Sequence, residues 1–234
     1  MPGKKSVFSL LGRYVSETII IIIGISISFA ISDWEKKRSA RTSYQDYLER
    51  LQVDMAIDSV QMVNDVAAYR RKIGGVDLVF AYHPGFPQDS VALLGQAQNA
   101  LLNYVEFLPN DNTFQILSST GDFNVFTNDS LVSELFRLYR YDYAYIHMNG
   151  REANHERLNQ VKPYLIDHMY YEDELTFPLV RTDIPAIVSD RYFRNICLEY
   201  QESCYAAITP YQQAMGRLIR VNQMIRQELE LLDR

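Results

Sequence analysis

The residues of this 234-residue chain best suited to bind a metal ion are its four histidines, His83, His147, His155 and His168. Glu152 and His155 have the Glu-x-x-His spacing that places both side chains on one face of a helix, as di-iron helical bundles require. Such a site needs that motif twice and two further carboxylates, and the sequence holds no second copy. His168 and Glu172 share a helix face at i, i+4, as a solvated polar pair does. The sequence therefore predicts no metal ligands, and a metal-binding bundle on Glu152 and His155 is the least favoured hypothesis.

Other catalytic patterns are also missing from the sequence. Phosphate-binding loops, nucleophile elbows and Cys-x-x-Cys pairs are absent, and the residues after His155-Glu156 do not continue a zinc-protease motif. Cys197 and Cys204 lie seven residues apart on one predicted helix, about 10 Å along its axis, which is too far for a mutual disulfide. We interpret both as small apolar core residues. The prediction is a protein that is not an enzyme, with no catalytic residues and no cofactor.

Composition excludes several protein classes. The chain is 47% hydrophobic and holds 17 Tyr and 11 Phe beside only 10 Gly and 8 Pro, which excludes disorder, collagen-like repeats and a disulfide scaffold. The net charge of −6 is unevenly distributed: residues 1–41 hold seven basic and three acidic side chains (+4), and residues 42–234 hold sixteen and twenty-six (−10). An acidic body repels phosphate, so we predict no nucleic-acid partner.

A membrane anchor is predicted near the N-terminus. Between Arg13 and Asp33 lie nineteen residues whose one formal charge is Glu17, and as a helix they span about 28 Å, the thickness of a bilayer core. Tyr14 and Trp34 stand at the two ends, where interfacial aromatic residues are expected. We therefore predict a transmembrane helix over residues 14–33, with Glu17 as an interfacial carboxylate.

A cleavable signal peptide is the competing interpretation of this segment. Lys4, Lys5 and Arg13 resemble a basic n-region, and residues 28–30 (Ser-Phe-Ala) offer small residues at a cleavage site. The signal-peptide interpretation is disfavoured by residues 33–52, which have a composition typical of helices and contain no turn residue, so the helix is expected to continue beyond the membrane. Basic residues do not decide the orientation, because three precede the anchor and four follow it. Gly24 and Ser28 form a small-xxx-small pair that would permit close approach of another helix.

Helical periodicity continues beyond the anchor. An apolar stripe predicts a stem helix, continuous with the membrane helix, as far as Gly74-Gly75: Leu48, Leu51, Met55, Met62, Val66 and Tyr69. Asp89-Ser90 is a candidate N-cap for the next helix. Residues 113–120 form a helix closed by Gly121, and a further helix opens at Asn128. This last helix extends to about Tyr171, with Asn149-Gly150 as a possible interruption.

A heptad seam is the clearest pattern in the chain. Ten residues alternate spacings of four and three: Phe193, Cys197, Tyr200, Cys204, Ala207, Tyr211, Ala214, Leu218, Val221 and Ile225. Because the phase is kept across Pro210, we predict one kinked helix there. Residues 139–145 carry tyrosines at the strand period of two, but Leu138 and Ile146 keep helical phase, so we predict a helix ringed with tyrosines.

These patterns predict an all-α fold. The transmembrane helix continues into a stem, and an antiparallel helical bundle with long helices follows. We divide the chain into a short cytoplasmic tail (1–13), a transmembrane helix (14–33), a helical stem (34–75) and a helical bundle domain (76–234).

Two stretches carry a resemblance to a known family. Residues 12–38, GRYVSETIIIIIGISISFAISDWEKKR, and residues 113–143, TFQILSSTGDFNVFTNDSLVSELFRLYRYDY, together make up about a quarter of the chain. They resemble an uncharacterised family of bacterial single-pass membrane proteins. The resemblance implies a body in the periplasm of a two-membrane bacterium, with the N-terminus inside; it implies no reaction and no functional residues.

The favoured hypothesis is a membrane-tethered, non-catalytic interaction or assembly module of a bacterial inner membrane. Its partners would be the lipid bilayer, through the basic residues 36–38 beside Trp34, and a second copy or another membrane protein. The alternative is a periplasmic helical bundle that senses a small molecule in a pocket among the tyrosines and acts through a membrane partner.

Overall fold

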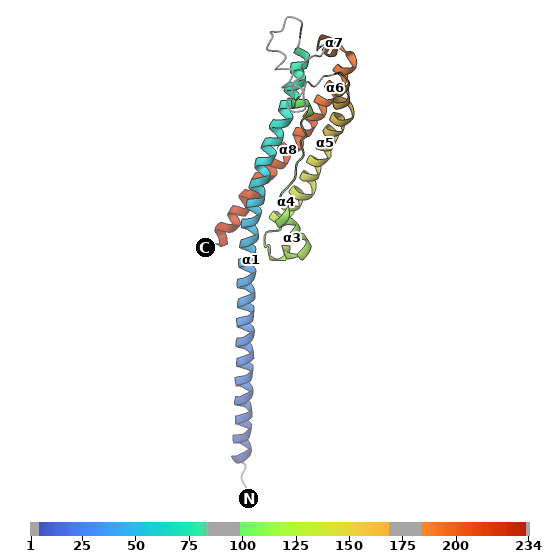
Figure 1. Ribbon diagram of the computed structural model, residues 1–234. Helices are drawn as coiled ribbons and strands as arrows, with labels where there is room; N and C mark the ends of the chain where they lie inside the picture. Colours follow the sequence, from blue (N-terminus) through green and yellow to red (C-terminus); the bar gives the residue numbers. More distant parts are fainter. Residues whose placement is uncertain (1–4, 82, 84–98, 169–183, 233–234) are drawn as a thin grey trace, which may run out of the picture.

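The computed structural model describes residues 5–81, 83, 99–168 and 184–232, and within these ranges the protein is helical without a strand (Figure 1). The α-helices are α1 (Lys5–Ala81), α3 (Asn112–Thr120), α4 (Asp129–Phe136), α5 (Tyr143–Glu156), α6 (Lys162–His168), α7 (Ile184–Ser189) and α8 (Arg191–Leu232). A short 3-10 helix covers Asp122–Val125, and residues 103–111 are not helical. The predicted all-α class is confirmed.

Helix α1 is one unbroken helix of 77 residues, so the predicted continuity between anchor and stem is confirmed. The predicted end of the stem at Gly74-Gly75 is wrong, because α1 continues to Ala81. A glycine costs a helix about 1 kcal/mol relative to alanine. That cost is offset here by packing, since Val76 and Val79 beyond the pair are buried in the core.

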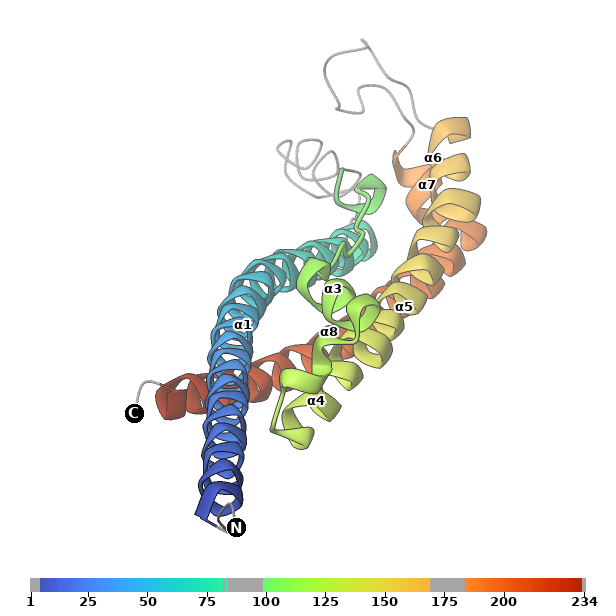
Figure 2. The ribbon, with the colours of Figure 1, turned by 90° about the horizontal axis from the view of Figure 1, so that it is seen from below.

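Helix α8 is the second long element, and it packs against both α1 and α5 (Figure 2). It continues through Pro210 as a single helix, as predicted. All ten residues of the predicted heptad seam are buried. Hydrogen bonds join the second half of α1 to α8, from Tyr44 with Glu228 at one end of their contact to Asp77 with Gln201 at the other.

Helical structure is continuous from Asp129 to His168. Two π-helical segments, Arg137–Asp142 and Arg157–Val161, join α4, α5 and α6. The possible interruption at Asn149-Gly150 is therefore wrong: both residues lie inside α5. The predicted tyrosine-ringed helix is confirmed, with Tyr139 and Tyr143 buried and Tyr141 and Tyr145 exposed.

Two predicted helix ends are confirmed in atomic detail. Gly121 terminates α3 with φ of 76°, in the left-handed region that glycine tolerates. The side-chain oxygen of Asn128 accepts a hydrogen bond from the Leu131 amide at 3.0 Å and so caps α4. The Asp89-Ser90 cap, the helix end near Tyr171 and the side chain of Glu172 lie outside the described residues.

Candidate membrane anchor and interaction surface

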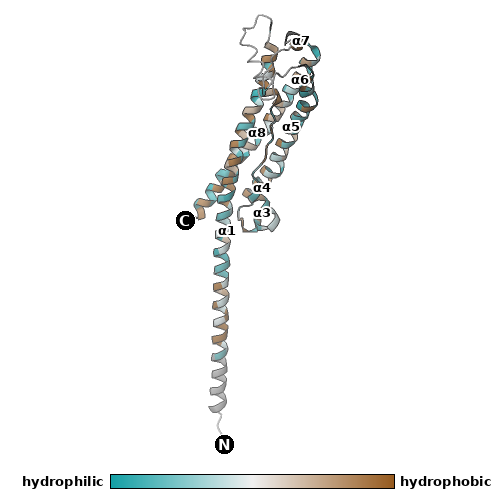
Figure 3. Cartoon of the chain, viewed as in Figure 1, coloured by the Kyte–Doolittle hydropathy of each residue, from teal (hydrophilic) through white to brown (hydrophobic). Residues whose placement is uncertain are grey.

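In the part of the chain that the structure describes, none of residues 17–33 of α1, here called the anchor half, is buried in the core. Its nine large apolar side chains between Ile19 and Ile31 are each at least 50% exposed. Among the residues described, α1 is the one helix long and apolar enough to cross a membrane (Figure 3). The Ser28 hydroxyl donates to the Gly24 carbonyl at 2.9 Å, so this polar group is satisfied inside the helix.

Basic and aromatic side chains follow the anchor directly. The Arg38 guanidinium lies 5.5 Å from the centroid of the Trp34 ring, and both side chains are exposed together with Lys36 and Lys37. A Trp beside several cations suits the interface between lipid tails and anionic headgroups. The side chains at this end of the anchor are therefore of the types that suit contact with a membrane surface.

The folded body contacts α1 within three turns of the anchor. The Arg41 side chain donates to the Leu232 carbonyl, and the Tyr44 hydroxyl donates to the Glu228 carboxylate at 2.9 Å. Asn128 donates to the other oxygen of Glu228 at 2.7 Å. Burial and the nearby Glu228 charge raise the pKa of Tyr44 above its ordinary value. The body is therefore attached next to the anchor, on the same helix.

Two buried carboxylates on α1 hold one end of the extended segment 103–111. Asp58 accepts hydrogen bonds from the Asn110 amide and the Tyr143 hydroxyl, both at 2.7 Å. Asp54, one turn earlier, accepts from the Asn110 side chain at 2.9 Å and the Thr113 amide at 3.2 Å. Burial raises the pKa of Asp58, although the hydrogen bonds that it accepts oppose this effect. Both carboxylates are occupied by protein donors.

Buried cations hold the other end of this segment through its backbone carbonyls. Lys72, which is 1% exposed, donates to the Asn103 carbonyl and to the Tyr200 hydroxyl, the latter at 2.7 Å. Arg157 donates to the Leu102 carbonyl at 3.0 Å. Burial lowers the pKa of Lys72 to about 8. Sequence analysis identified none of these buried charges, because their partners lie many residues away in the sequence.

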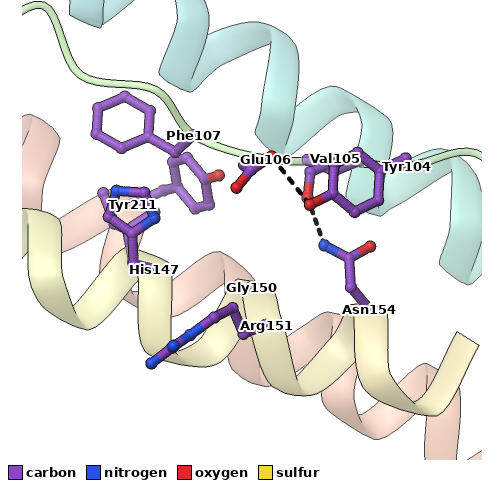
Figure 4. Close-up of a pocket in the computed structure, with 10 residues that line it drawn as sticks. Tyr104, Val105, Glu106, Phe107, His147, Gly150, Arg151, Asn154 and Tyr211 are labelled. Atoms are coloured by element: carbon purple, nitrogen blue, oxygen red, sulfur yellow. Dashed lines mark hydrogen bonds between the residues drawn. The ribbon is translucent and has the colours of Figure 1, made fainter. Parts of the chain in front are cut away.

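A small pocket between the extended segment, α5 and α8 includes two tyrosines, Tyr104 and Tyr211, in its lining. Phe107, His147 and Tyr211 meet at one end of it, and Asn154 donates to the Val105 carbonyl at 2.7 Å at the other (Figure 4). Its free volume is about 10 Å³, room for about one water molecule. Rings fill the surrounding space: Phe107 packs edge-on against Tyr143 with 5.0 Å between ring centroids. A metabolite would need this packing to open.

The residues considered for metal binding do not converge. Glu152 and His155 are exposed, and His155 is hydrogen-bonded to Asn159 at 3.0 Å. His168 stacks on Tyr164, with 4.0 Å between the ring centroids. Within the described residues, no group of three His, Cys, Asp or Glu side chains could hold a metal ion.

Both cysteines are free and buried, so their interpretation as core residues is confirmed. Burial raises the pKa of the Cys197 thiol to about 12 and that of Cys204 to about 11. A buried thiol with a raised pKa carries little reactive thiolate at neutral pH.

An exposed apolar surface on the body half of α1 escaped sequence analysis. Val53, Ile57 and Val60, here called the outer ridge, are 52–61% exposed. A shallow groove of about 320 Å³ adjoins it, lined by Ser59, Val60, Val63, Asn64, Met215, Leu218 and Ile219. The sequence contains a pattern that could have predicted this surface. Its β-branched residues are spaced four and three apart, so they lie on the face of the helix opposite the buried stripe.

No known protein family, curated protein or solved structure matches this chain. The resemblance to bacterial single-pass membrane proteins therefore remains a prediction.

Proposed function

We propose that this protein is a membrane-tethered, non-catalytic interaction or assembly module of a bacterial inner membrane. The observation that carries the proposal is the division of α1, in which residues 19–31 expose an apolar surface while residues 44–79 contribute to the core. A helix that is apolar on every side suits a lipid environment. Because the same helix continues into the core without a break, the body would be held close to the membrane surface.

The proposed topology is single-pass. Residues 1–13 form a short cytoplasmic tail, residues 14–33 cross the membrane, and the body lies in the periplasm. Within the body, α1 and α8 run in opposite directions as parts of an antiparallel bundle. This arrangement is supported by three hydrogen-bonded pairs between the two helices, in which the residue number on α1 rises as the residue number on α8 falls. The pairs are Tyr44 with Glu228, Gln52 with Asn222 and Asp77 with Gln201.

The partner would be a second copy of the chain or another membrane protein. Support comes from the exposed apolar side chains of the outer ridge, which no other part of the described chain covers. The charged groups of the interior are already hydrogen-bonded to the extended segment, so their evident role is to hold the fold together.

Chemical crosslinking in native membranes tests the proposal. An amine-reactive crosslinker should convert the protein into a discrete larger species, because Lys36 and Lys37 are exposed beside the membrane. The matched control replaces both with arginine, which keeps the charge and removes the amines at these two positions, while the exposed Lys162 stays reactive. A reporter fused after Arg234 gives the side of the membrane in the same cells. A strictly monomeric protein with no crosslinked partner would contradict the proposal.

A further inference from the structure

We infer that a second copy of this chain docks on the outer ridge, so that two stems associate back to back above the membrane. The inference deepens the proposed function, on which it rests, by naming the partner and the surface. Its structural basis is the row formed by Val53, Ile57 and Val60 on α1.

Val53 and Ile57 of the outer ridge point away from the body, and Val60 borders the groove with α8. Val53 and Ile57 each lie two residues from the fully buried Met55, and two residues correspond to about 200° of turn around an α-helix. The second copy could therefore approach this face without displacing the body. Asn64 continues the row by one turn and is exposed. A single polar residue in an apolar helix seam can fix the register between two helices.

The residue types on the ridge are unfavourable for an isolated helix surface. Valine and isoleucine have lower helix propensity than alanine, leucine or lysine, and they offer no polar group to water. The exposed Tyr141 and Tyr145 of the body differ, because a tyrosine hydroxyl can stay hydrated. A row of exposed β-branched aliphatic side chains is better explained by a protein surface that covers it.

The area is sufficient for a symmetric pair. The ridge and the adjoining Val63 and Ile219 provide five aliphatic side chains that are each more than half exposed. Complete burial of these side chains would remove on the order of 500 Å² per copy, so two copies would bury about 1,000 Å², which is below the standard interface size and meets the minimum for a biological interface. Anchorage in one membrane raises the effective concentration of the two copies and reduces the affinity that the contact must supply.

The anchor favours a second copy over an unrelated partner. Two identical anchors hold their stems at the same depth and in the same direction, so each ridge residue meets its own counterpart across a twofold axis. Gly24 and Val60 are separated by thirty-six residues, or ten turns at about 3.6 residues per turn, and so are Ser28 and Asn64. The small-residue face of the anchor therefore points in the same direction as the ridge.

The charges beside the ridge are also complementary in a parallel pair. Glu49 and Arg50 are exposed one turn before Val53, on opposite edges of the ridge face, where Glu49 accepts a hydrogen bond from Gln45 and Arg50 forms a solvent-exposed ion pair with Asp46 at 2.9 Å. A parallel twofold pair places the Glu49 edge of one copy against the Arg50 edge of the other, so that unlike charges meet twice.

Single-cysteine crosslinking in native membranes tests the inference in the full chain. Val53→Cys, Ile57→Cys and Val60→Cys place one accessible thiol each on the ridge, while the native cysteines stay buried. Leu198→Cys is the matched control, since Leu198 is 51% exposed on α8. After mild oxidation, the fraction of disulfide-linked dimer should be at least several-fold higher for the ridge variants than for Leu198→Cys or for the unchanged protein.

A charge variant separates association from misfolding. Ile57→Glu combined with Val60→Glu should reduce the dimer fraction in detergent about tenfold, as measured by native mass spectrometry. Its thermal unfolding should stay unchanged, because both side chains are already exposed.

The outcomes distinguish this inference from the proposed function. Crosslinking of the Leu198 variant in preference to the ridge variants, or ridge thiols that link only to another protein, would overturn the second-copy inference and leave the interaction module intact. A monomer with every crosslinker, amine-reactive ones included, would overturn both.

Discussion

The two halves of α1 have the same secondary structure and opposite surroundings. Between Ile19 and Ile31 every large apolar side chain is at least 50% exposed, whereas the apolar stripe from Tyr44 to Val79 is buried to 8% exposure or less. Residues 19–31 are apolar around most of the helix circumference, whereas the body half has a buried apolar stripe on the face that the body covers and the shorter outer ridge on the opposite face. The comparison teaches that the apolar side chains of residues 19–31 have no protein cover within the described chain, while those of the body half are covered by α8 and the extended segment.

The largest expected effect lies in the body half. Tyr200→Ala removes a fully buried ring that accepts a hydrogen bond from Lys72 and donates to the Leu101 carbonyl. We expect a loss of about 3–5 kcal/mol in the free energy of unfolding, because a large cavity forms and a buried cation loses a partner. Denaturant unfolding in detergent measures it.

Tyr205→Ala is the matched control for that substitution. Tyr205 lies on the same helix and is 56% exposed, so its truncation should change the unfolding free energy by less than about 0.5 kcal/mol. Equal losses for the two variants would show that α8 does not have the buried face described above.

The next effect lies in the anchor half. Ile23→Arg places a charge near the middle of the predicted span, at a cost of about 3 kcal/mol for membrane insertion. We expect a clear shift of the protein from the membrane fraction to the soluble or degraded fraction. Ile57→Arg, also on an exposed position of α1, should remain in the membrane. Identical fractionation of the two variants would remove the distinction between the halves.

Loss of a buried carboxylate should affect the extended segment. Asp58→Ala leaves the Asn110 amide and the Tyr143 hydroxyl without their acceptor, at a cost of about 2–3 kcal/mol. Hydrogen exchange of residues 103–111 should accelerate. Asp58→Asn, which keeps one acceptor oxygen, should lose less; faster exchange in Asp58→Asn than in Asp58→Ala would contradict this role.

Two glycines of α1 give the smallest effect. Among the described residues, no side chain or distant backbone lies within 4 Å of a Cβ added at Gly24 or Gly74. Gly74→Ala should therefore stabilise the body by about 0.5–1 kcal/mol through helix propensity. Gly24→Ala should leave the unfolding of the body unchanged, because it lies in the other half of the helix. Destabilisation by Gly74→Ala would mean that this position requires glycine.

Local patterns made much of the helical structure predictable. The heptad seam of α8 depends on spacing alone, and its phase carried the prediction correctly through Pro210. The caps at Gly121 and Asn128 depend on one residue and its immediate neighbours. Such features need no knowledge of distant contacts, so periodicity and capping chemistry suffice.

Features that depend on distant contacts were not predictable. Glycine at 74 and 75 indicated a helix end, but tertiary packing of Val76 and Val79 extends α1 to Ala81. The buried side chain of Lys72 pairs with Asn103 and Tyr200, 31 and 128 residues away. Buried charges of this kind look like ordinary surface residues until their partners are known.

The intact mass of the protein extracted from native membranes tests the central claim most directly. If α1 both anchors and carries the body, detergent, but not alkaline carbonate, releases a chain that retains residues 14–33 and has a mass near 27.2 kDa. A soluble chain that begins after Ala30 would identify the segment as a cleaved signal peptide and would contradict the membrane-tethered account.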